Sequence, residues 1–412
     1  MSQNAAALRA RARDLDAADP LAAYAMRFAP GEGADGAALV SYLDGNSLGR
    51  PVETVPDALA AFARHEWGGR LIRGWDEGWL ALPQSLGDRI GAACLGAASG
   101  QTVVADSTSV LIFKLLRAAI AAQSDSARDE LVILRDEFPT DRFIVERIAA
   151  DHGLTVRWVD APLEAGIMPE LAAEAVSDRT IAALFSGVAY RSAWWADMPA
   201  ITRIVQAAGA LVIWDCSHAV GSVPMQFDEW GVDMAVGCSY KYLNGGPGAP
   251  AWSYVAARHH AALRNPIAGW IGAASPFAMT SGFEAAPGIR ALASGTPPVL
   301  AMVPLAEMVS LIERAGIDAI RAKSIALTEY AIELVDALIP AASLSSPRDA
   351  ARRGGHLTIE HPKSAIAVER LWAEGVIPDF RHPSGVRIGL SPLSTTFAEV
   401  ERGIRALATA LS

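Results

Sequence analysis

The sequence predicts an α/β fold, with a mostly parallel sheet covered by helices and a smaller α+β domain at the C-terminal end. Two observations lead to this prediction. Through the middle of the chain, apolar runs of strand length alternate with stretches of helical periodicity, as in sheets built from parallel strands and crossover helices. After about residue 300 this alternation stops, and a long helical stretch leads into shorter strands and helices.

The predicted strands of the large sheet are near-continuous apolar runs. Such runs are buried on both faces, which is typical of parallel strands with helices packed on either side. They are TVVADS (102–107), LVILRDE (131–137), LTVRWVDA (154–161), TIAALFSG (180–187), ALVIWDCSH (210–218) and VDMAVGCSY (232–240). Helical patterns lie between several of them, at 110–122, 141–153 and 198–210.

The C-terminal part has its own pattern. A helical stretch spans 301–338, and the strand-like runs HLTIEHP (356–362) and VRIGLSP (386–392) flank a helical pattern at 364–376. Thr396 and Glu399 form the signature of a capping box before the last helix. We therefore predict three parts: an arm over residues 1–55 that joins the small domain, a large domain over 56–300 and a small domain over 301–412.

The composition narrows the function classes. The net charge of −10 disfavours nucleic acid or an anionic membrane as a partner, and no apolar run approaches the ~18 residues of a membrane helix. The first residues mix Arg with Asp, which is not the pattern of a signal peptide. Cys94, Cys216 and Cys238 are odd in number and contain no CxxC pair, so we expect reduced thiols and a cytoplasmic enzyme.

Polar side chains follow the carboxyl ends of five predicted strands. Ligands of open α/β sheets bind at this edge, so we expect one shared pocket. The candidate residues are Asp106, Ser107, Thr108 and Ser109 after the first run, Phe138 and Asp141 after the second, Ser186 after the fourth, Asp215 and His218 after the fifth, and Tyr240 and Lys241 after the sixth. Thr108 and Ser109 begin a predicted helix, whose free N–H groups suit a phosphate; simple N-capping is the alternative.

Lys241 is one of four lysines among 35 basic residues, and it precedes the glycine-rich run NGGPGAP. An amine can lose its proton and form an imine, whereas arginine cannot. Asp215, at the end of a buried strand, would keep a pyridine nitrogen protonated and make that ring an electron sink. Either residue alone fits a structural role. Together with the phosphate-type helix start, they predict a Schiff-base lysine and its cofactor.

Two other motifs carry little weight. GEGADG (31–36) matches the GxGxxG pattern of dinucleotide sites, but it does not follow a buried strand. His259 and His260 are adjacent, so they do not share one helix face as paired metal ligands would. We therefore predict no metal site.

The longest motifs resemble those of kynureninase, a fold-type-I pyridoxal-phosphate family of the class V aminotransferase-like superfamily. They are YLDGNSLG (42–49), EFPTD (137–141), LFSGV (184–188), WDCSHAVGSVPM (214–225), GVDMAVGCSYKYLNGGPGAP (231–250), SGTPP (294–298) and RGGHLTIEHP (353–362). The resemblance runs from about residue 42 to 392. It implies a homodimer that binds pyridoxal 5′-phosphate, with the large domain as the cofactor-binding domain.

The resemblance also implies a role for each matching residue. Lys241 would bind the cofactor covalently, Asp215 would pair with its ring nitrogen, and Tyr240 would hold the phosphate or carry protons. Arg387, which alternates with apolar Val386 and Ile388, would clamp the substrate α-carboxylate. The other implied cofactor contacts are Thr108, Ser109 and Ser186 on the phosphate side, Phe138, Pro139, Thr140 and Asp141 along the ring, His218 beside it, and Trp270 and Thr296 across the dimer interface.

The implied reaction is hydrolysis of the Cβ–Cγ bond of L-kynurenine, or of 3-hydroxykynurenine, to L-alanine and the matching anthranilate in tryptophan catabolism. Ala273 and Ser275 stand where the family usually carries polar side chains, which leaves the aromatic part of the substrate open. An aminotransferase or a β-eliminating lyase would use the same lysine, aspartate and arginine. A cysteine desulfurase would need a thiol in the loop 342–355, which has none. A nicotinamide dehydrogenase built on GEGADG would not need Lys241. A non-catalytic binding protein of this fold would bind the cofactor but convert no substrate.

Overall fold

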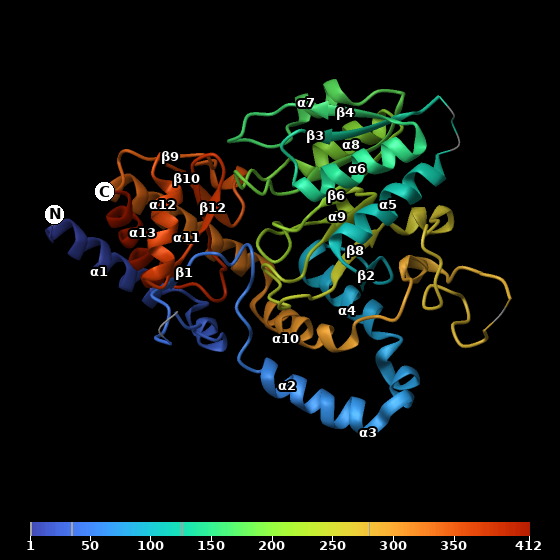
Figure 1. Ribbon diagram of the computed structural model, residues 1–412, viewed down its shortest axis with the longest axis horizontal. Coiled ribbons are helices and arrows are strands. Elements are labelled where there is room, and N and C mark those ends of the chain that lie inside the picture. The colour runs from blue at the N-terminus through green and yellow to red at the C-terminus, as the bar shows by residue number, and fades with distance from the viewer. Residues whose placement is uncertain (1, 34–35, 124, 126, 280) are drawn as a thin grey trace.

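A seven-stranded sheet forms the centre of the larger of two lobes in the computed structural model (Figure 1), which describes residues 2–33, 36–123, 125, 127–279 and 281–412. Its strands are β2 Thr102–Ala105, β3 Glu130–Leu134, β4 Thr155–Val159, β5 Thr180–Ser186, β6 Leu211–Asp215, β7 Met234–Gly237 and β8 Ala251–Val255. The strand order is β2-β8-β7-β6-β5-β3-β4, and β8 alone runs antiparallel to its neighbours. The predicted, mostly parallel sheet is confirmed.

Strand β8 is missing from the sequence prediction. It follows β7 through the glycine-rich run and returns antiparallel, pairing Met234 with Val255 and Gly237 with Trp252. An antiparallel partner needs no crossover helix. A pattern in which helices separate the strands therefore does not reveal β8.

Helices cover both faces of this sheet. They are α4 Leu82–Ile90, α5 Thr108–Ala122, α6 Pro139–His152, α7 Pro169–Ala175, α8 Met198–Ala207, α9 Phe227–Trp230 and α10 Val299–Ala315. Successive residues of one strand enter opposite cores, because side chains alternate between faces. On β6, Val212 and Trp214 pack in the core that contains α8 and α10, whereas Ile213 packs in the core that contains α5 and α6.

The smaller lobe combines helices with an antiparallel sheet of order β12-β13-β10-β9. Its elements are α11 Ile317–Leu338, β9 Ser343–Leu344, β10 His356–Glu360, α12 Ser364–Ala373, β11 Val376–Ile377, β12 Asp379–Arg381, β13 Gly385–Gly389 and α13 Phe397–Leu411. The helical stretch expected over 301–338 is present as two helices, α10 and α11, separated at Gly316, whose φ of +78° lies in the left-handed region.

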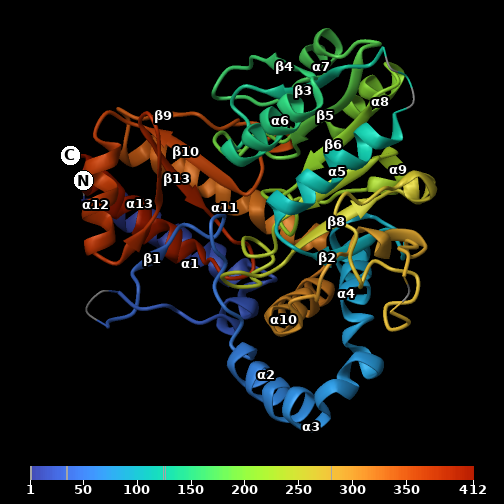
Figure 2. The ribbon, with the colours of Figure 1, turned by 45° about the vertical axis from the view of Figure 1, so that its right-hand side comes forward.

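The N-terminal segment lies against the smaller lobe. Helix α1 Ser2–Ala18 lies beside α13, and both chain ends are close together in Figures 1 and 2. The Asp16 carboxylate accepts hydrogen bonds from the N–H groups of Phe397 and Ala398, at 2.8 and 3.0 Å. Further on, β1 Ser41–Tyr42 pairs in parallel with β11. The boundaries at residues 55 and 300 stay predictions.

The expected cap of the last helix is present, because Thr396 Oγ1 accepts a hydrogen bond from Glu399 N–H at 3.1 Å. The Glu399 carboxylate accepts a hydrogen bond from Tyr42 N–H at 2.8 Å and pairs with Arg50. It therefore ties the N-terminal segment to the small lobe.

Helix α2 Val55–Ala61 packs against α10, and the segment that follows it, with α3 Gly68–Arg70, projects away from both lobes in the two views. Within the described part of the chain, we find no helix with the length and apolar character needed to cross a membrane.

Candidate active site

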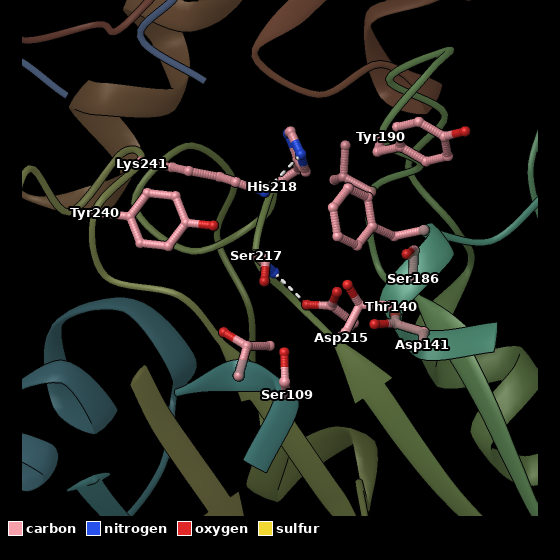
Figure 3. Close-up of a pocket in the computed structure, with 13 residues that line it drawn as sticks. Ser109, Thr140, Asp141, Ser186, Tyr190, Asp215, Ser217, His218, Tyr240 and Lys241 are labelled. Carbon is pink, nitrogen blue, oxygen red and sulfur yellow. Dashed lines mark hydrogen bonds between the residues drawn. The ribbon is translucent and has the colours of Figure 1, made fainter. Parts of the chain in front are cut away.

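A cavity of about 290 Å³ lies at the carboxyl ends of β5, β6 and β7 (Figure 3), close to the lower end of the ~300–1,000 Å³ range of ligand pockets. The parallel strands bring these ends to one edge of the sheet, and α5 and α6 begin there. The cavity is lined by Thr108, Ser109, Phe138, Thr140, Asp141, Ser186, Val188, Tyr190, Asp215, Ser217, His218, Tyr240 and Lys241. The shared pocket expected from the strand ends is therefore present.

The start of α5 forms one wall. Ser107 caps the helix by accepting a hydrogen bond from Val110 N–H, and Thr108 and Ser109 follow in its first turn. Asp106 before them has a φ of +47°, and its carboxylate binds the buried ammonium of Lys114 at 2.6 Å. Because α5 is 15 residues long, its free N–H groups and positive dipole end suit a phosphate at this wall.

Buried carboxyl groups form the opposite wall. Asp215 Oδ1 accepts a hydrogen bond from Ser217 N–H at 2.8 Å. Burial, followed by the charge of Asp215, raises the pKa of Asp141 well above its ordinary value, so that its protonated carboxyl shares a hydrogen bond with Asp215. The two acids therefore share a proton within this wall.

Lys241 and His218 meet at the other end of the cavity. The Lys241 Nζ lies 2.8 Å from His218 Nε2, and both side chains are buried. Burial and then the Lys241 charge lower the pKa of His218 well below its ordinary value. His218 is thus a neutral imidazole, which adds no positive charge beside Lys241.

Aromatic side chains frame the lysine. The Lys241 Nζ lies 5.8 Å from the centroid of the Phe138 ring and 6.0 Å from that of Tyr240. Phe138 also packs edge-on against Tyr190, with the ring centroids 5.6 Å apart. Burial raises the pKa of Tyr240, so its phenol stays protonated and can donate a hydrogen bond.

The two most distinctive motifs of the sequence contact each other behind Lys241. Gly49 N–H donates to Tyr240 O at 2.8 Å, and Asn244 Nδ2 donates to Arg50 O at 2.8 Å. A Cβ on Gly49 would lie 2.4 Å from the Lys241 carbonyl oxygen, which is closer than atoms can approach. YLDGNSLG therefore supports the turn that carries the lysine.

Arg387 lies outside the cavity lining, on β13 and almost fully buried. It donates to Tyr190 O at 2.8 Å, to Ser47 Oγ at 2.7 Å and to Asp379 Oδ2 at 2.6 Å. Its neighbours Val386 and Ile388 face the small-lobe core, as their alternation with Arg387 predicts. The guanidinium is thus held by partners from three separate parts of the chain.

Three further residues predicted from the motifs do not line this cavity. Pro139 occupies the first turn of α6. Trp270 packs against Trp75, with the ring centroids 5.7 Å apart, and Thr296 is exposed. Both belong to the segment between β8 and α10, and their action across a dimer interface stays a prediction.

Sequence reasoning missed Val188, Tyr190 and Ser217, which line the cavity. A usable signal existed for Ser217, since it stands between Asp215 and His218. Tyr190 follows Ser186 by four residues, but whether its side chain faces the cavity depends on the turn after β5, which the sequence does not show.

The remaining motifs have structural partners or fall outside the description. His259 Nε2 lies 2.8 Å from Asp233 Oδ1, and His260 Nε2 lies 2.9 Å from Val255 O. Among the residues that the structure describes, no three His, Cys, Asp or Glu side chains gather as a metal site would require. In GEGADG, residues 34 and 35 lie outside the described residues, and Glu32 forms an antiparallel bridge with Ala38 nearby.

The cavity fits pyridoxal 5′-phosphate in each of its chemical parts. Lys241 would supply an amine for the aldehyde, Asp215 an anion for the ring nitrogen, Phe138 an aromatic face, and the start of α5 donors for the phosphate.

Sequence comparisons find similar proteins along nearly the whole chain. The family model described as kynureninase C-terminal domain matches residues 320–407. The kynureninase of Burkholderia pseudomallei is 40% identical over 410 residues, covering 97% of this chain and 94% of that protein. The kynureninase of Pseudomonas fluorescens is 39% identical over 401 residues, covering 95% and 93%.

Solved structures share the fold at lower identity. The lyase C-DES, solved with glycine covalently linked to its pyridoxal-phosphate cofactor, has a TM-score of 0.79 at 16% identity, covering 89% of this chain and 96% of that chain. The cysteine desulfurase CsdA of Escherichia coli has a TM-score of 0.75 at 16% identity, covering 95% and 98%. At this identity, these similarities concern the fold alone.

Proposed function

The chain belongs to the kynureninase family, and from that premise we propose that it hydrolyses L-kynurenine, or its 3-hydroxy form, to L-alanine and the matching anthranilate. It is a pyridoxal-phosphate-dependent hydrolase of a carbon–carbon bond, as the motifs predicted. The observation that carries the proposal is that Lys241 and Asp215, the amine and the anion the cofactor needs, line one cavity.

Pyridoxal 5′-phosphate, when bound, supplies an electron sink that stabilises negative charge at the substrate Cα. Asp215 holds the proton on the ring nitrogen, because a buried carboxylate beside that nitrogen favours the charged ring. Lys241 Nζ removes the proton from Cα, and the neutral His218, 2.8 Å away, holds this nitrogen in place through a hydrogen bond.

The hydrolytic step adds a water oxygen to the γ-carbonyl carbon; the Cβ–Cγ bond then breaks and Cβ takes up a proton. Tyr240 is the proposed source of that proton or a donor to the phosphate, since its phenol is protonated and lines the cavity. Arg387 is the proposed partner of the substrate α-carboxylate. The substrate carboxylate would then compete with the Asp379 carboxylate for the Arg387 guanidinium.

Product analysis tests this function. Purified protein with pyridoxal 5′-phosphate is expected to convert kynurenine or 3-hydroxykynurenine to equal amounts of alanine and the matching anthranilate. The ratio of the two rates measures the preference that Ala273 and Ser275 leave open. Formation of a ketoacid would instead indicate transamination, and release of ammonia a β-elimination.

A homodimer and a cytoplasmic location complete the proposal. Trp270 and Thr296 lie outside the cavity of their own chain, as residues that serve a partner's cofactor would. The projecting segment near them exposes Leu71 and Ile72, whose exposed fractions are 59% and 76%. Neighbouring exposed apolar side chains such as these suit a subunit interface. The three cysteines are free and buried, which agrees with a reducing compartment.

Subunit mixing tests the shared site. Lys241→Ala and Trp270→Ala homodimers are each expected to be impaired. A mixed dimer of the two is expected to regain one intact site, which combines Lys241 of one subunit with Trp270 of the other. The exposed Trp372 on α12 offers a control variant, Trp372→Ala, that should be active by itself. If Trp270 acts within its own chain, mixing will restore no activity.

A further inference from the structure

Glu137 is a buried acid that the proposed chemistry does not use. It stands directly before Phe138, and only 2% of it is exposed. Its carboxyl binds both polar groups of Ser186, accepting from the backbone N–H at 3.1 Å and from the hydroxyl. Phe138 N–H adds a bond to Glu137 Oε1 at 3.3 Å. Glu137 therefore fixes the end of β5 to the segment that begins α6.

This contact has consequences across the sheet. Ser186 pairs in register with Asp215 on β6, so the residue that Glu137 holds is the direct neighbour of the proposed anion. In Figure 3, Ser186, Asp141 and Asp215 gather on the same side of the cavity, and Lys241 lies across from them. A displaced Ser186 would loosen the wall on which Asp215 sits.

The charges around Glu137 do not balance if every carboxyl group is ionised. Glu137 faces Ser186 on β5, Asp215 on β6 and Asp141 in the first turn of α6. Lys241 is the one Lys or Arg among the described residues that line the cavity. His218 is neutral. Carboxylates this close in a buried site cannot all be charged, so protons remain on some of them.

We propose that Glu137 is a positioning residue, which anchors Ser186 and keeps a proton in the carboxyl cluster so that Asp215 carries the negative charge. This inference rests on the proposed pairing of Asp215 with the cofactor ring. Asp141, the third acid of the cluster, shares a hydrogen bond with Asp215 and is raised in pKa by the charges of Asp215 and Glu137. A neutral Glu137 thus leaves Asp215 as the charged partner for a cationic ring nitrogen.

The raised pKa of Glu137 determines how its contribution to the stability of the fold changes with pH. Burial, followed by the Asp215 charge and against the Ser186 hydrogen bond, raises its pKa to about 7. The folded protein then holds a proton that the unfolded chain releases from about pH 4.5 upward. Glu137 therefore stabilises the fold fully at low pH, and this contribution is lost as the pH rises through about 7.

Unfolding of the cofactor-free protein tests the retained proton. Glu137→Gln mimics the protonated acid and keeps an acceptor for Ser186 N–H. Its melting temperature is expected to match that of the wild type at pH 5 and to exceed it at pH 8. Glu146→Gln, an exposed change on helix α6, which follows Glu137, should follow the wild type at both values. A Glu137→Gln difference that is constant with pH would overturn the proposal.

Cofactor titration tests the anchoring. Glu137→Gln is expected to bind pyridoxal 5′-phosphate as tightly as the wild type, whereas Glu137→Ala, which frees Ser186, should weaken binding about tenfold. Equal weakening in both variants would mean that the charge of Glu137 is required, and no weakening in either would deny the anchor. If even the wild type failed to bind the cofactor, the proposed function would fall, while the unfolding test of the proton would still stand.

Discussion

Lys241→Ala is expected to abolish turnover and the covalent link to the cofactor together, with the rate falling by more than about 10⁴-fold. The residue carries two tasks, since its amine would both bind the aldehyde and move the Cα proton. Borohydride reduction followed by peptide mass spectrometry should place the cofactor on residues 237–250 of the wild type and nowhere in the variant. Loss of both signals in one substitution ties the chemistry to this nitrogen.

Two further variants separate the roles of charge and nucleophile. Lys241→Arg keeps a cation beside His218 but cannot form an imine, so it should be as inactive as the alanine variant. Lys363→Ala, which removes an exposed lysine of the small lobe, should leave turnover and labelling unchanged. A Lys241→Ala protein that still turned over substrate and still became labelled would contradict the proposed role.

The parts of the fold that follow from local pattern could be read from the sequence. Near-continuous apolar runs such as that of β5 identify strands buried on both faces, and the parallel arrangement then brings Ser186, Asp215 and Lys241 to one edge. Local pattern does not show where the chain turns back to form an antiparallel strand. Strand β8 needs no helix before it, and the break at Gly316 depends on one residue in a long helical stretch.

The site shows the same division. Residues next to a strand end, including Thr108, Asp141 and His218, line the cavity as predicted. The role of Arg387 was implied by the resemblance to the family. Its partners Ser47, far away in the sequence, and Asp379, on the neighbouring strand β12, are not revealed by any local pattern. Glu137 belongs to the motif EFPTD, but the sequence predicted no role for it. Its importance depends on the pairing of β5 with β6 and on burial, and both are properties of the folded chain.

Asp215→Asn is the second substitution with a large expected effect. Asparagine keeps an oxygen that accepts the hydrogen bond from Ser217 N–H, so the local backbone should be preserved. It removes the negative charge that would keep the cofactor ring nitrogen protonated. We expect kcat to fall by about 10²–10³-fold, the loss typical when one charge-stabilising group is removed from an active site.

The covalent link through Lys241 should survive in Asp215→Asn, because the amine and the aldehyde are unchanged; this distinguishes the variant from Lys241→Ala. Asp160→Asn provides the matched control, since Asp160 also follows a strand of the large sheet but its side chain is 72% exposed and pairs with Arg135 at the surface. That change should leave kcat unaltered. If Asp215→Asn kept full activity, the electron sink would not depend on this carboxylate. Asp141, which lines the cavity and shares a hydrogen bond with Asp215, would then be the remaining acid near the ring.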